Sequence, residues 1–264
     1  MSALLDAEPV PLTARIDFAH PDLALRVNGR RLVVSYDRGH SFDGPWLLPG
    51  FGSELTSRTD YVVNGRDECL FFMSHTRGAP SDGRDRLLRD RSFCAITRDG
   101  GLSYEFLASI TSETEPVRSV MSSTGRGRSG QLLTALRRKR GEQGFIDIYQ
   151  SDDEGMSWFF RSRAASTGRR NGNPPAMIRL RDDRLCLVYG DRDEPIGIKG
   201  RVSHDNAGTW SEEILLRSSD TWDIGYPRMV QRADGMLVAI YYIHRPDQFR
   251  EQYIEACIWH PDEL

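Results

Sequence analysis

The stretch Ser151-Asp152-Asp153-Glu154-Gly155-Met156-Ser157-Trp158 follows the pattern Ser-x-Asp-x-Gly-x-Ser-Trp, and this eight-residue box occurs more than once. Residues 35–42 match it fully, residues 97–104 match it with conservative changes, and residues 203–210 match it except for Ala207 at the glycine position. The boxes open at positions 35, 97, 151 and 203, which gives successive spacings of 62, 54 and 52 residues. The sequence is therefore that of a repeat protein.

A period near fifty residues with one turn signature per period is typical of a β-propeller, in which each blade has four antiparallel strands. The fourth unit shows the pattern best, with strands predicted at 175–180, 185–189 and 199–202 before its box and at 214–216 after it. The second and third units repeat this order. We therefore predict an all-β, single-domain propeller over residues 1–264, with five visible blades and a sixth possible.

The first and last units are less regular than the others. The first has apolar runs at 23–27 and 31–35 before its box and a doubtful inner strand, and the fifth, at 226–259, has no box and no outer strand. An open ring would leave exposed sheet edges that invite aggregation. We therefore expect residues 15–18 to complete the last blade.

Composition indicates a soluble globular protein, with 39% hydrophobic and 28% charged residues and a net charge of −3. This balance gives no reason to expect nucleic acid or a membrane surface as partner. The basic run 137–140 is predicted to be a solvated hairpin end, because a nucleic-acid patch would need interleaved aromatic residues. No run of about 18 apolar residues could cross a membrane. Residues 1–13 lack the basic start and apolar stretch of a signal peptide, so we expect a cytoplasmic protein.

The four cysteines lie far apart in sequence, each within an apolar run that reads as a strand. We expect them to be buried, reduced thiols. The chain has no CxxC pair and no His/Cys cluster with the spacing of metal ligands, so neither a metal nor another cofactor is expected. The cysteines are Cys69, Cys94, Cys186 and Cys257.

The residues of the box can be explained by the structure of a tight turn alone. A tight turn between strands needs a carboxylate to accept backbone N–H bonds, a glycine with positive φ and an aromatic ring to hold the turn on the blade, as Asp153, Gly155 and Trp158 can. Because Ala207 would be strained in that conformation, we expect the fourth turn to be modified, with Gly208 taking the role.

Such turns lie at the periphery of a propeller, whereas ligands generally bind where the inner strands begin around the axis. Polar residues stand at the predicted start of inner strands in several units, and others follow second strands. Together they would make a polar cup with several cations, which suits an anionic or hydroxyl-rich ligand. The inner-strand set is Arg58, Asp60, Arg118, Asn173, Asp223, Tyr226 and Arg228, and the second-strand set is Tyr189, Arg192 and His244.

Four such boxes, known as Asp-boxes, at blade spacing resemble the sialidase (neuraminidase) superfamily and its bacterial BNR-repeat relatives over about residues 20–260. The resemblance implies a tyrosine nucleophile assisted by a glutamate, an aspartate acid/base and three arginines that hold the substrate carboxylate. Tyr226 matches the nucleophile, because Gly225-Tyr226-Pro227-Arg228-Met229 precedes a strand, an Asp-Gly turn and another strand. A tyrosine nucleophile is a recognised exception among retaining glycosidases.

The sequence departs from the family pattern in the other roles. Asn173 stands where the glutamate is expected, the Phe-Arg-Ile-Pro motif of the first arginine is absent, and Arg192 falls only near the place of another. Asp60 is the better acid/base candidate because it lies between Arg58 and an aromatic residue at an inner-strand start, although it could equally be ion-paired with Arg58 as scaffold. Asp223 is the alternative acid/base.

These observations favour an exo-acting, sialidase-like glycoside hydrolase for an acidic or otherwise polar sugar, with Tyr226 and Asp60 as its central pair. The departures make it sialidase-like instead of a true sialidase. The alternative is a non-catalytic propeller that binds a glycan or a protein partner on the same cup. Substrate contacts are expected from Arg58, Arg118, Asn173 and Arg228.

Overall fold

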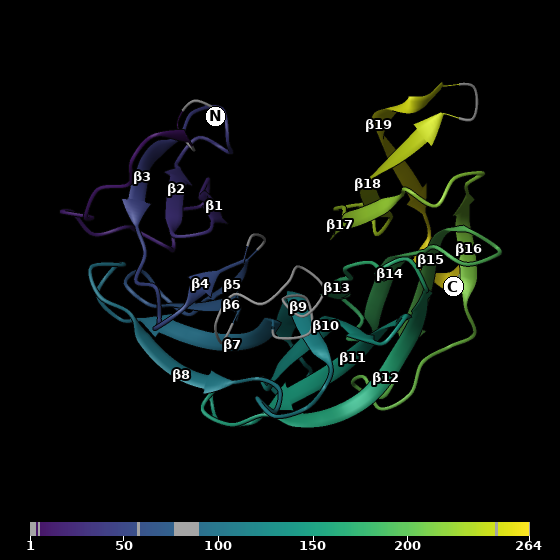
Figure 1. Cartoon of the computed structure of the whole chain (residues 1–264), viewed down its shortest axis with the longest axis horizontal. Helices are drawn as coiled ribbons and strands as arrows, with labels where there is room; N and C mark the ends of the chain where they lie inside the picture. The colour runs from purple at the N-terminus through teal and green to yellow at the C-terminus, as the bar shows by residue number, and fades with distance from the viewer. Residues whose placement is uncertain (1–3, 5, 57–58, 77–89, 246–247, 264) are drawn as a thin grey trace.

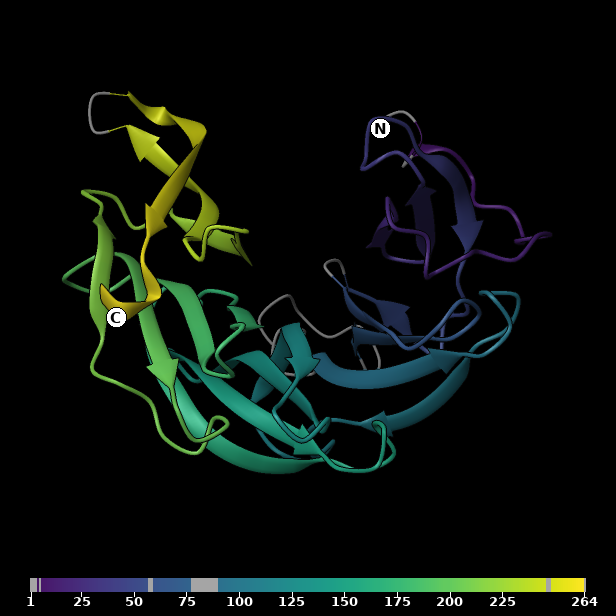
Figure 2. The ribbon, with the colours of Figure 1, turned by 180° about the vertical axis from the view of Figure 1, so that it is seen from behind.

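The protein is described here by a computed structural model that covers residues 4, 6–56, 59–76, 90–245 and 248–263. It is an all-β chain with a short 3₁₀ helix at Pro261–Glu263. The described strands form five antiparallel sheets, which are the five blades of a β-propeller. Figures 1 and 2 show the blades following one another along an arc in chain order. The predicted fold is confirmed.

Blades III and IV are complete, with their strands paired in sequence order from the axis outward. Blade III consists of β9 (Arg118–Arg126), β10 (Leu132–Arg140), β11 (Gln143–Ser151) and β12 (Phe159–Gly168). Blade IV consists of β13 (Ala176–Arg179), β14 (Leu185–Asp191), β15 (Gly197–Ser203) and β16 (Ile214–Ser218).

The inner position of blade II is filled by two short strands, both of which pair with the same neighbour. The blade consists of β4 (Glu54–Leu55), β5 (Asp60–Val63), β6 (Cys69–Thr76), β7 (Asp90–Thr97) and β8 (Glu105–Ser109). Blade I has three described strands, β1 (Ala24–Asn28), β2 (Arg31–Ser35) and β3 (Asp43–Leu47), and blade V has β17 (Gly225–Gln231), β18 (Leu237–Arg245) and β19 (Gln248–Trp259).

The two terminal blades lack different strands. The Asp-box of blade I lies between β2 and β3, so β1 to β3 correspond to the second, third and outer strands of the complete blades. Blade V begins with an inner strand and ends at its third strand. Among the described residues no strand pairing joins blade I to blade V, and Figure 1 shows them facing each other across an open side of the arc.

The prediction that residues 15–18 complete blade V is wrong. Ile16 N–H donates to the Gly100 carbonyl at 2.8 Å, and Phe18 N–H donates to the Arg66 carbonyl at 2.9 Å, and both acceptors lie in turns of blade II. Ile16 and Phe18 are buried in the hydrophobic cluster shared by blades I and II, which includes Phe71 of β6. Burial of these two side chains, at roughly 2 kcal/mol each, fixes the segment there.

Hydrophobic clusters between neighbouring blades form the core. The face of blade V that packs on blade IV carries Met229, Ala239 and Tyr241, all of which are buried. Its opposite face is apolar but uncovered, as shown by the exposure of Ile240 (46%) and Ile254 (71%). Blade V therefore has one partner where an inner blade has two.

The four Asp-box turns share one geometry. In the third box, Gly155 N–H donates to Ser151 Oγ at 2.8 Å, and Ser157 N–H donates to Asp153 Oδ1 at 2.8 Å. Ala207 occupies the place of Gly155 in the fourth box, with a φ of 64° and its N–H bonded to Ser203 Oγ at 2.9 Å. The expectation that Gly208 replaces it is therefore wrong. The serine bond and the complete burial of the Ala207 methyl hold the residue in this conformation.

Candidate functional site

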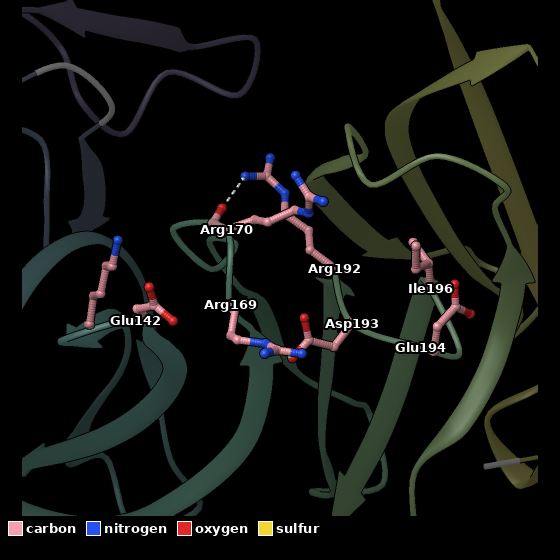
Figure 3. Close-up of a pocket in the computed structure, with 8 residues that line it drawn as sticks. Glu142, Arg169, Arg170, Arg192, Asp193, Glu194 and Ile196 are labelled. Atoms are coloured by element: carbon pink, nitrogen blue, oxygen red, sulfur yellow. Dashed lines mark hydrogen bonds and ion pairs between the residues drawn. The ribbon is translucent and has the colours of Figure 1, made fainter.

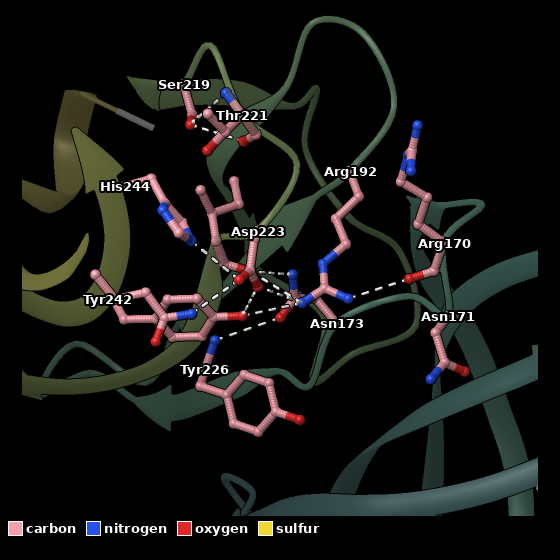
Figure 4. A network of polar contacts seen from close by, with 12 residues as sticks. Arg170, Asn171, Asn173, Arg192, Ser219, Thr221, Asp223, Tyr226, Tyr242 and His244 are labelled. Carbon is pink, nitrogen blue, oxygen red and sulfur yellow. Dashed lines mark hydrogen bonds and ion pairs between the residues drawn. The ribbon is translucent and has the colours of Figure 1, made fainter. Parts of the chain in front are cut away.

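Tyr226 lies at the start of β17, the inner strand of blade V. Its φ is 55°, a left-handed value that costs a non-glycine residue roughly 1–2 kcal/mol, and it lies within a register shift between Gly225 and Arg228. The side chain is 39% exposed. Figure 4 shows the phenol ring directed away from the polar network beside it. The local backbone therefore directs the phenol ring away from Asp223.

Asn173 holds this backbone in place. Its Oδ1 accepts a hydrogen bond from Tyr226 N–H at 3.3 Å, and its Nδ2 donates to the Ile224 carbonyl at 2.8 Å. The side chain is fully buried. A Cβ on Gly190 or Gly225 would approach it to 2.5 or 2.0 Å, so both glycines are needed to admit the amide. In this structure Asn173 holds the backbone before Tyr226, and its expected role as a substrate contact stays a prediction.

Arg137 is a part of the site that the sequence did not indicate. Its Nε and Nη2 donate to the Asn171 carbonyl at 3.1 and 2.7 Å, and its Nη1 lies 3.4 Å from the Tyr226 hydroxyl oxygen. Burial lowers the pKa of Arg137 below its usual range; the nearby Tyr226 acts against this shift, and the charges of Arg118 and Arg192 add to it.

The prediction that residues 137–140 are a solvated hairpin end holds for Arg140, which is exposed where β10 ends, but is wrong for Arg137 and Arg138. Strand β10 continues through Arg140, and Arg137 and Arg138 are both buried. Arg138 forms an ion pair with Glu115 at 2.6 Å and donates to the Tyr149 hydroxyl at 2.8 Å. The sequence does contain a weak signal for Arg137, since it follows Leu133 and Ala135 at the alternating positions of one strand.

Two of the predicted arginines, Arg118 and Arg192, lie close enough to Arg137 to affect its titration. Arg118 is paired with Asp90 at 2.8 Å, with both side chains nearly buried. Arg192 donates to the Arg170 carbonyl at 3.1 Å, to the Tyr242 hydroxyl at 3.1 Å and to the Ile224 carbonyl at 3.3 Å. Arg58, another predicted contact, lies outside the described residues.

Asp223 is the centre of the polar network in Figure 4. It accepts hydrogen bonds from the Tyr242 hydroxyl at 2.8 Å and from Gln252 Nε2 at 2.8 Å, and it lies 3.0 Å from His244 Nε2. Arg192 stands 3.9 Å away. Burial raises the pKa of Asp223, but the bonds from His244, Tyr242 and Gln252 outweigh it and hold the pKa below its usual range. Asp223 is therefore stabilised as a carboxylate, which suits an anchor for its neighbours better than a proton donor.

Asp60 lies on β5 of blade II and is linked to blade V. Its Oδ2 accepts the Thr124 N–H bond at 2.6 Å, and its Oδ1 lies 3.9 Å from Nη1 of Arg228. Arg228 and Tyr226 are both exposed on β17. Tyr189 lies elsewhere: it is buried in the core and its hydroxyl donates to Glu213. It has no surface to offer a ligand.

An open cavity of about 920 Å³ lies beside this network, at the ends of β10 and β14. Figure 3 shows Arg170 and Arg192 on one side of it and the pair formed by Arg169 and Asp193 on another. Within the described residues, no group of three or more His, Cys, Asp or Glu side chains is placed to hold a metal ion. The full lining is Lys139, Glu142, Arg169, Arg170, Arg192, Asp193, Glu194 and Ile196.

Residues 23–239 match the family model of the BNR repeat-like domain. The chain belongs to the BNR repeat-like family. Among solved structures, this BNR repeat-like chain is similar to a Dyadobacter fermentans protein of unknown function, with 24% identity and a TM-score of 0.68 over 86% of this chain and 63% of the other.

Two further structures that are similar to this BNR repeat-like chain are those of named enzymes. The NanB sialidase of Streptococcus pneumoniae is 15% identical over 89% of this chain and 36% of its own, with a TM-score of 0.63. An α-L-arabinanase of Penicillium chrysogenum complexed with arabinobiose is 16% identical over 76% of this chain and 60% of its own, with a TM-score of 0.55. The chain thus spans less than two thirds of each, and the likeness establishes a sialidase-like fold. No curated protein matches the chain. In the described part of the chain, no helix is long and apolar enough to cross a membrane.

Proposed function

We propose that this BNR repeat-like protein is an exo-acting glycoside hydrolase for an acidic sugar, with Tyr226 as its nucleophile. The contact between the exposed Tyr226 hydroxyl and buried Arg137 supports this most directly. Arg137 Nη1 lies 3.4 Å from the phenol oxygen, and Arg118 and Arg192 lie near Arg137, so positive charge gathers beside the proposed nucleophile. The same charges would hold a carboxylate of the substrate.

In the proposed reaction, Tyr226 loses its proton to solvent and the phenolate attacks the anomeric carbon. The glycosidic bond breaks as a glycosyl–tyrosine bond forms, and Asp60 gives its proton to the leaving oxygen. In the second half, Asp60 takes a proton from water, which displaces the tyrosine oxygen and releases the sugar. Asp60 keeps the acid/base role because Arg228 connects it to β17, the strand that carries Tyr226. Asp223 is the weaker candidate, since three donors hold it ionised.

The charge of the site favours an acidic sugar over a neutral one. The named enzymes of similar fold include both a sialidase and an arabinanase, so fold likeness leaves the class of sugar open. The charge of Arg137 beside Tyr226 would be poorly used by a neutral arabinoside, because Arg137, unlike Arg118 and Arg192, has no ion-pair partner in the described part of the chain.

A non-catalytic glycan-binding protein is the second candidate. The amide of Asn173 favours it, because this residue stands where the resembling enzymes carry a glutamate and its two hydrogen bonds are used by the backbone. An amide cannot accept the proton of Tyr226. The same cationic surface would then bind an acidic glycan without cleaving it.

Turnover of aryl glycosides separates the two candidates. The purified protein would be offered aryl sialosides, hexuronides and arabinofuranosides beside the variants Tyr226→Phe and Asp60→Asn. Tyr36→Phe is the matched control, because Tyr36 is 37% exposed and lies in blade I. We expect release of the aryl group from an acidic glycoside, with a loss of at least 100-fold in Tyr226→Phe and none in Tyr36→Phe. Binding of an acidic glycan without turnover would reject the hydrolase and support the second candidate.

A further inference from the structure

Blade III places like charges opposite each other next to Tyr226. Lys139 of β10 is the cross-strand partner of Arg118 of β9, and Arg137 lies two residues before Lys139 on the same face. Like charges directly opposite in an antiparallel pair are destabilising. Burial lowers the pKa of Lys139, the charges of Arg118 and Arg137 lower it further, and only Glu142 acts in the other direction. A bound anion would relieve this repulsion.

Three cations in or near the cavity have no ion-pair partner in the described part of the chain: Lys139 and Arg170 of its lining, and Arg137, two residues before Lys139 on β10. The other three are paired, Arg118 with Asp90 at 2.8 Å, Arg169 with Asp193 at 3.5 Å and Arg192 with Asp223 at 3.9 Å. Two acids of the cavity lining, Glu142 and Glu194, also lie outside these pairs. In Figure 3, Glu194 lies beside Ile196, away from Arg170. The charge that remains is positive near Arg137 and Arg170.

The loop between blades III and IV holds Arg137 and Arg192 through its backbone carbonyls. Arg170, Asn171 and Gly172 have successive φ values of 32°, 76° and 64°, a left-handed run that non-glycine residues rarely adopt. In this conformation the Asn171 carbonyl accepts from Arg137 and the Arg170 carbonyl accepts from Arg192. Residues held in rare conformations concentrate at ligand sites, where the strain preorganises the binding groups.

An exposed aromatic ring, that of Trp222, lies beside two arginines of the cavity lining. Trp222 is 39% exposed, and the guanidinium carbons of Arg170 and Arg192 lie 5.1 and 5.7 Å from its ring centroid. A large ring with a free edge offers an apolar surface on which the hydrophobic face of a sugar can pack. The cations beside it would then reach an acidic group carried by the same sugar.

We propose that the site takes an oligosaccharide with two anionic groups. The first acidic unit lies at Tyr226 and Arg137. The next unit, on the leaving-group side, packs on Trp222 and places its own acidic group between Arg170 and Lys139. The proposal rests on the function proposed above and narrows its substrate class to glycans with adjacent acidic units.

Calorimetric titration of monomers and dimers tests this. The probes are galacturonic acid and its α-1,4-linked dimer, and N-acetylneuraminic acid and its α-2,8-linked dimer. At least one dimer should bind tenfold or more tightly than its monomer, with a steeper loss of affinity as salt rises. Lys139→Gln and Arg170→Gln should each remove most of that gain and leave monomer binding unchanged. Arg232→Gln is the control, since this exposed arginine is paired with Asp234 in the turn after β17.

The outcomes separate the two proposals. Arg137→Gln should weaken both monomer and dimer, because it acts at the first unit. The two-anion inference is overturned, and the acidic-sugar function stands, in either of two cases. In the first, a monomer binds in an Arg137-dependent manner but no dimer binds more tightly. In the second, the gain in affinity of the dimer survives in Lys139→Gln and Arg170→Gln. If no probe binds, or if binding is indifferent to Arg137, the acidic-sugar function fails and this inference fails with it.

Discussion

Replacing Asn173 by alanine should cost the fold about 3 kcal/mol. The change removes the bond from Nδ2 to the Ile224 carbonyl, 2.8 Å long, and the bond from Tyr226 N–H to Oδ1, 3.3 Å long. Asn173 and Ile224 are fully buried, so water does not readily replace the amide. The Ile224 carbonyl keeps the bond from Arg192 at 3.3 Å, so losing the Asn173 bond costs it about 1 kcal/mol, whereas the Tyr226 N–H loses its Asn173 acceptor at a cost of about 2 kcal/mol.

Asn173→Asp adds a pH dependence whose sign follows from the same two bonds. A carboxylate can accept from Tyr226 N–H but cannot donate to the Ile224 carbonyl, whereas the protonated acid can do both. The pKa of the new group should therefore be higher in the folded than in the unfolded chain. Its stabilising form is present below the unfolded pKa, near 4, and is lost as pH rises through the folded pKa. The aspartate variant should thus lie closer to wild type at pH 4 than at pH 7.

Urea unfolding followed by tryptophan fluorescence measures both effects. Asn64→Ala is the control, because Asn64 is exposed and also makes two side-chain hydrogen bonds, with Glu68 and Arg126. It should lose less than about 1 kcal/mol. The reasoning about Asn173 is refuted if Asn173→Ala loses no more than Asn64→Ala, or if the deficit of Asn173→Asp is the same at pH 4 and pH 7.

Three further results are expected from single measurements. The Cys94 and Cys186 thiols, whose pKa values burial raises to about 12, should react with a disulfide reagent only after unfolding; rapid reaction in the native protein would contradict their burial. Hydrogen bonds from Ser157, chiefly its hydroxyl, lower the pKa of Asp153, so the stability that its carboxylate provides is present above pH 4 and lost as pH falls through the folded pKa. Asp153→Asn should therefore lower the melting temperature at pH 7. The difference between its melting temperatures at pH 7 and pH 3 should be smaller than in the wild type, and an equal difference would count against this. Ile254→Asp should change the free energy of unfolding by less than about 0.5 kcal/mol, because this side chain is 71% exposed; a large loss would mean that the blade V face is covered in solution.

The repeat of the Asp-box made the fold predictable, because each copy marks the turn between the third and outer strands and thereby sets the register of a blade. It also located Tyr226 and Arg192, which stand at fixed places relative to strands. Arg137 could not be found in this way, since its role depends on a bond to the Asn171 carbonyl 34 residues away. The local sequence shows a basic run, for which exposure to solvent is the simplest expectation.

Tertiary contacts also decided the positions that the sequence placed wrongly. By length and pattern, residues 15–18 could form an edge strand of blade V. They lie on blade II instead, because burial of the Ile16 and Phe18 side chains there stabilises the fold more. Asn173 was correctly placed at the start of an inner strand, yet its amide is enclosed between Gly190 and Gly225. Sequence periodicity gives the position along a strand, whereas burial depends on neighbours from other blades.

The open side of the arc and the candidate site are parts of the same surface. Arg228 is the cross-strand partner of Ile240, so both lie on the face of blade V opposite the one that packs on blade IV. The Tyr226 ring lies 5.7 Å from the ring of Tyr242, which is two residues from Ile240 on β18 and shares that face. The 3.9 Å contact between Arg228 and Asp60 links this face to blade II. Since no described blade covers it, a ligand can approach Tyr226 from the open side without displacing a strand. The exposure of the proposed nucleophile therefore follows from the missing neighbour of blade V, and any chain that covered this face would also control access to Tyr226.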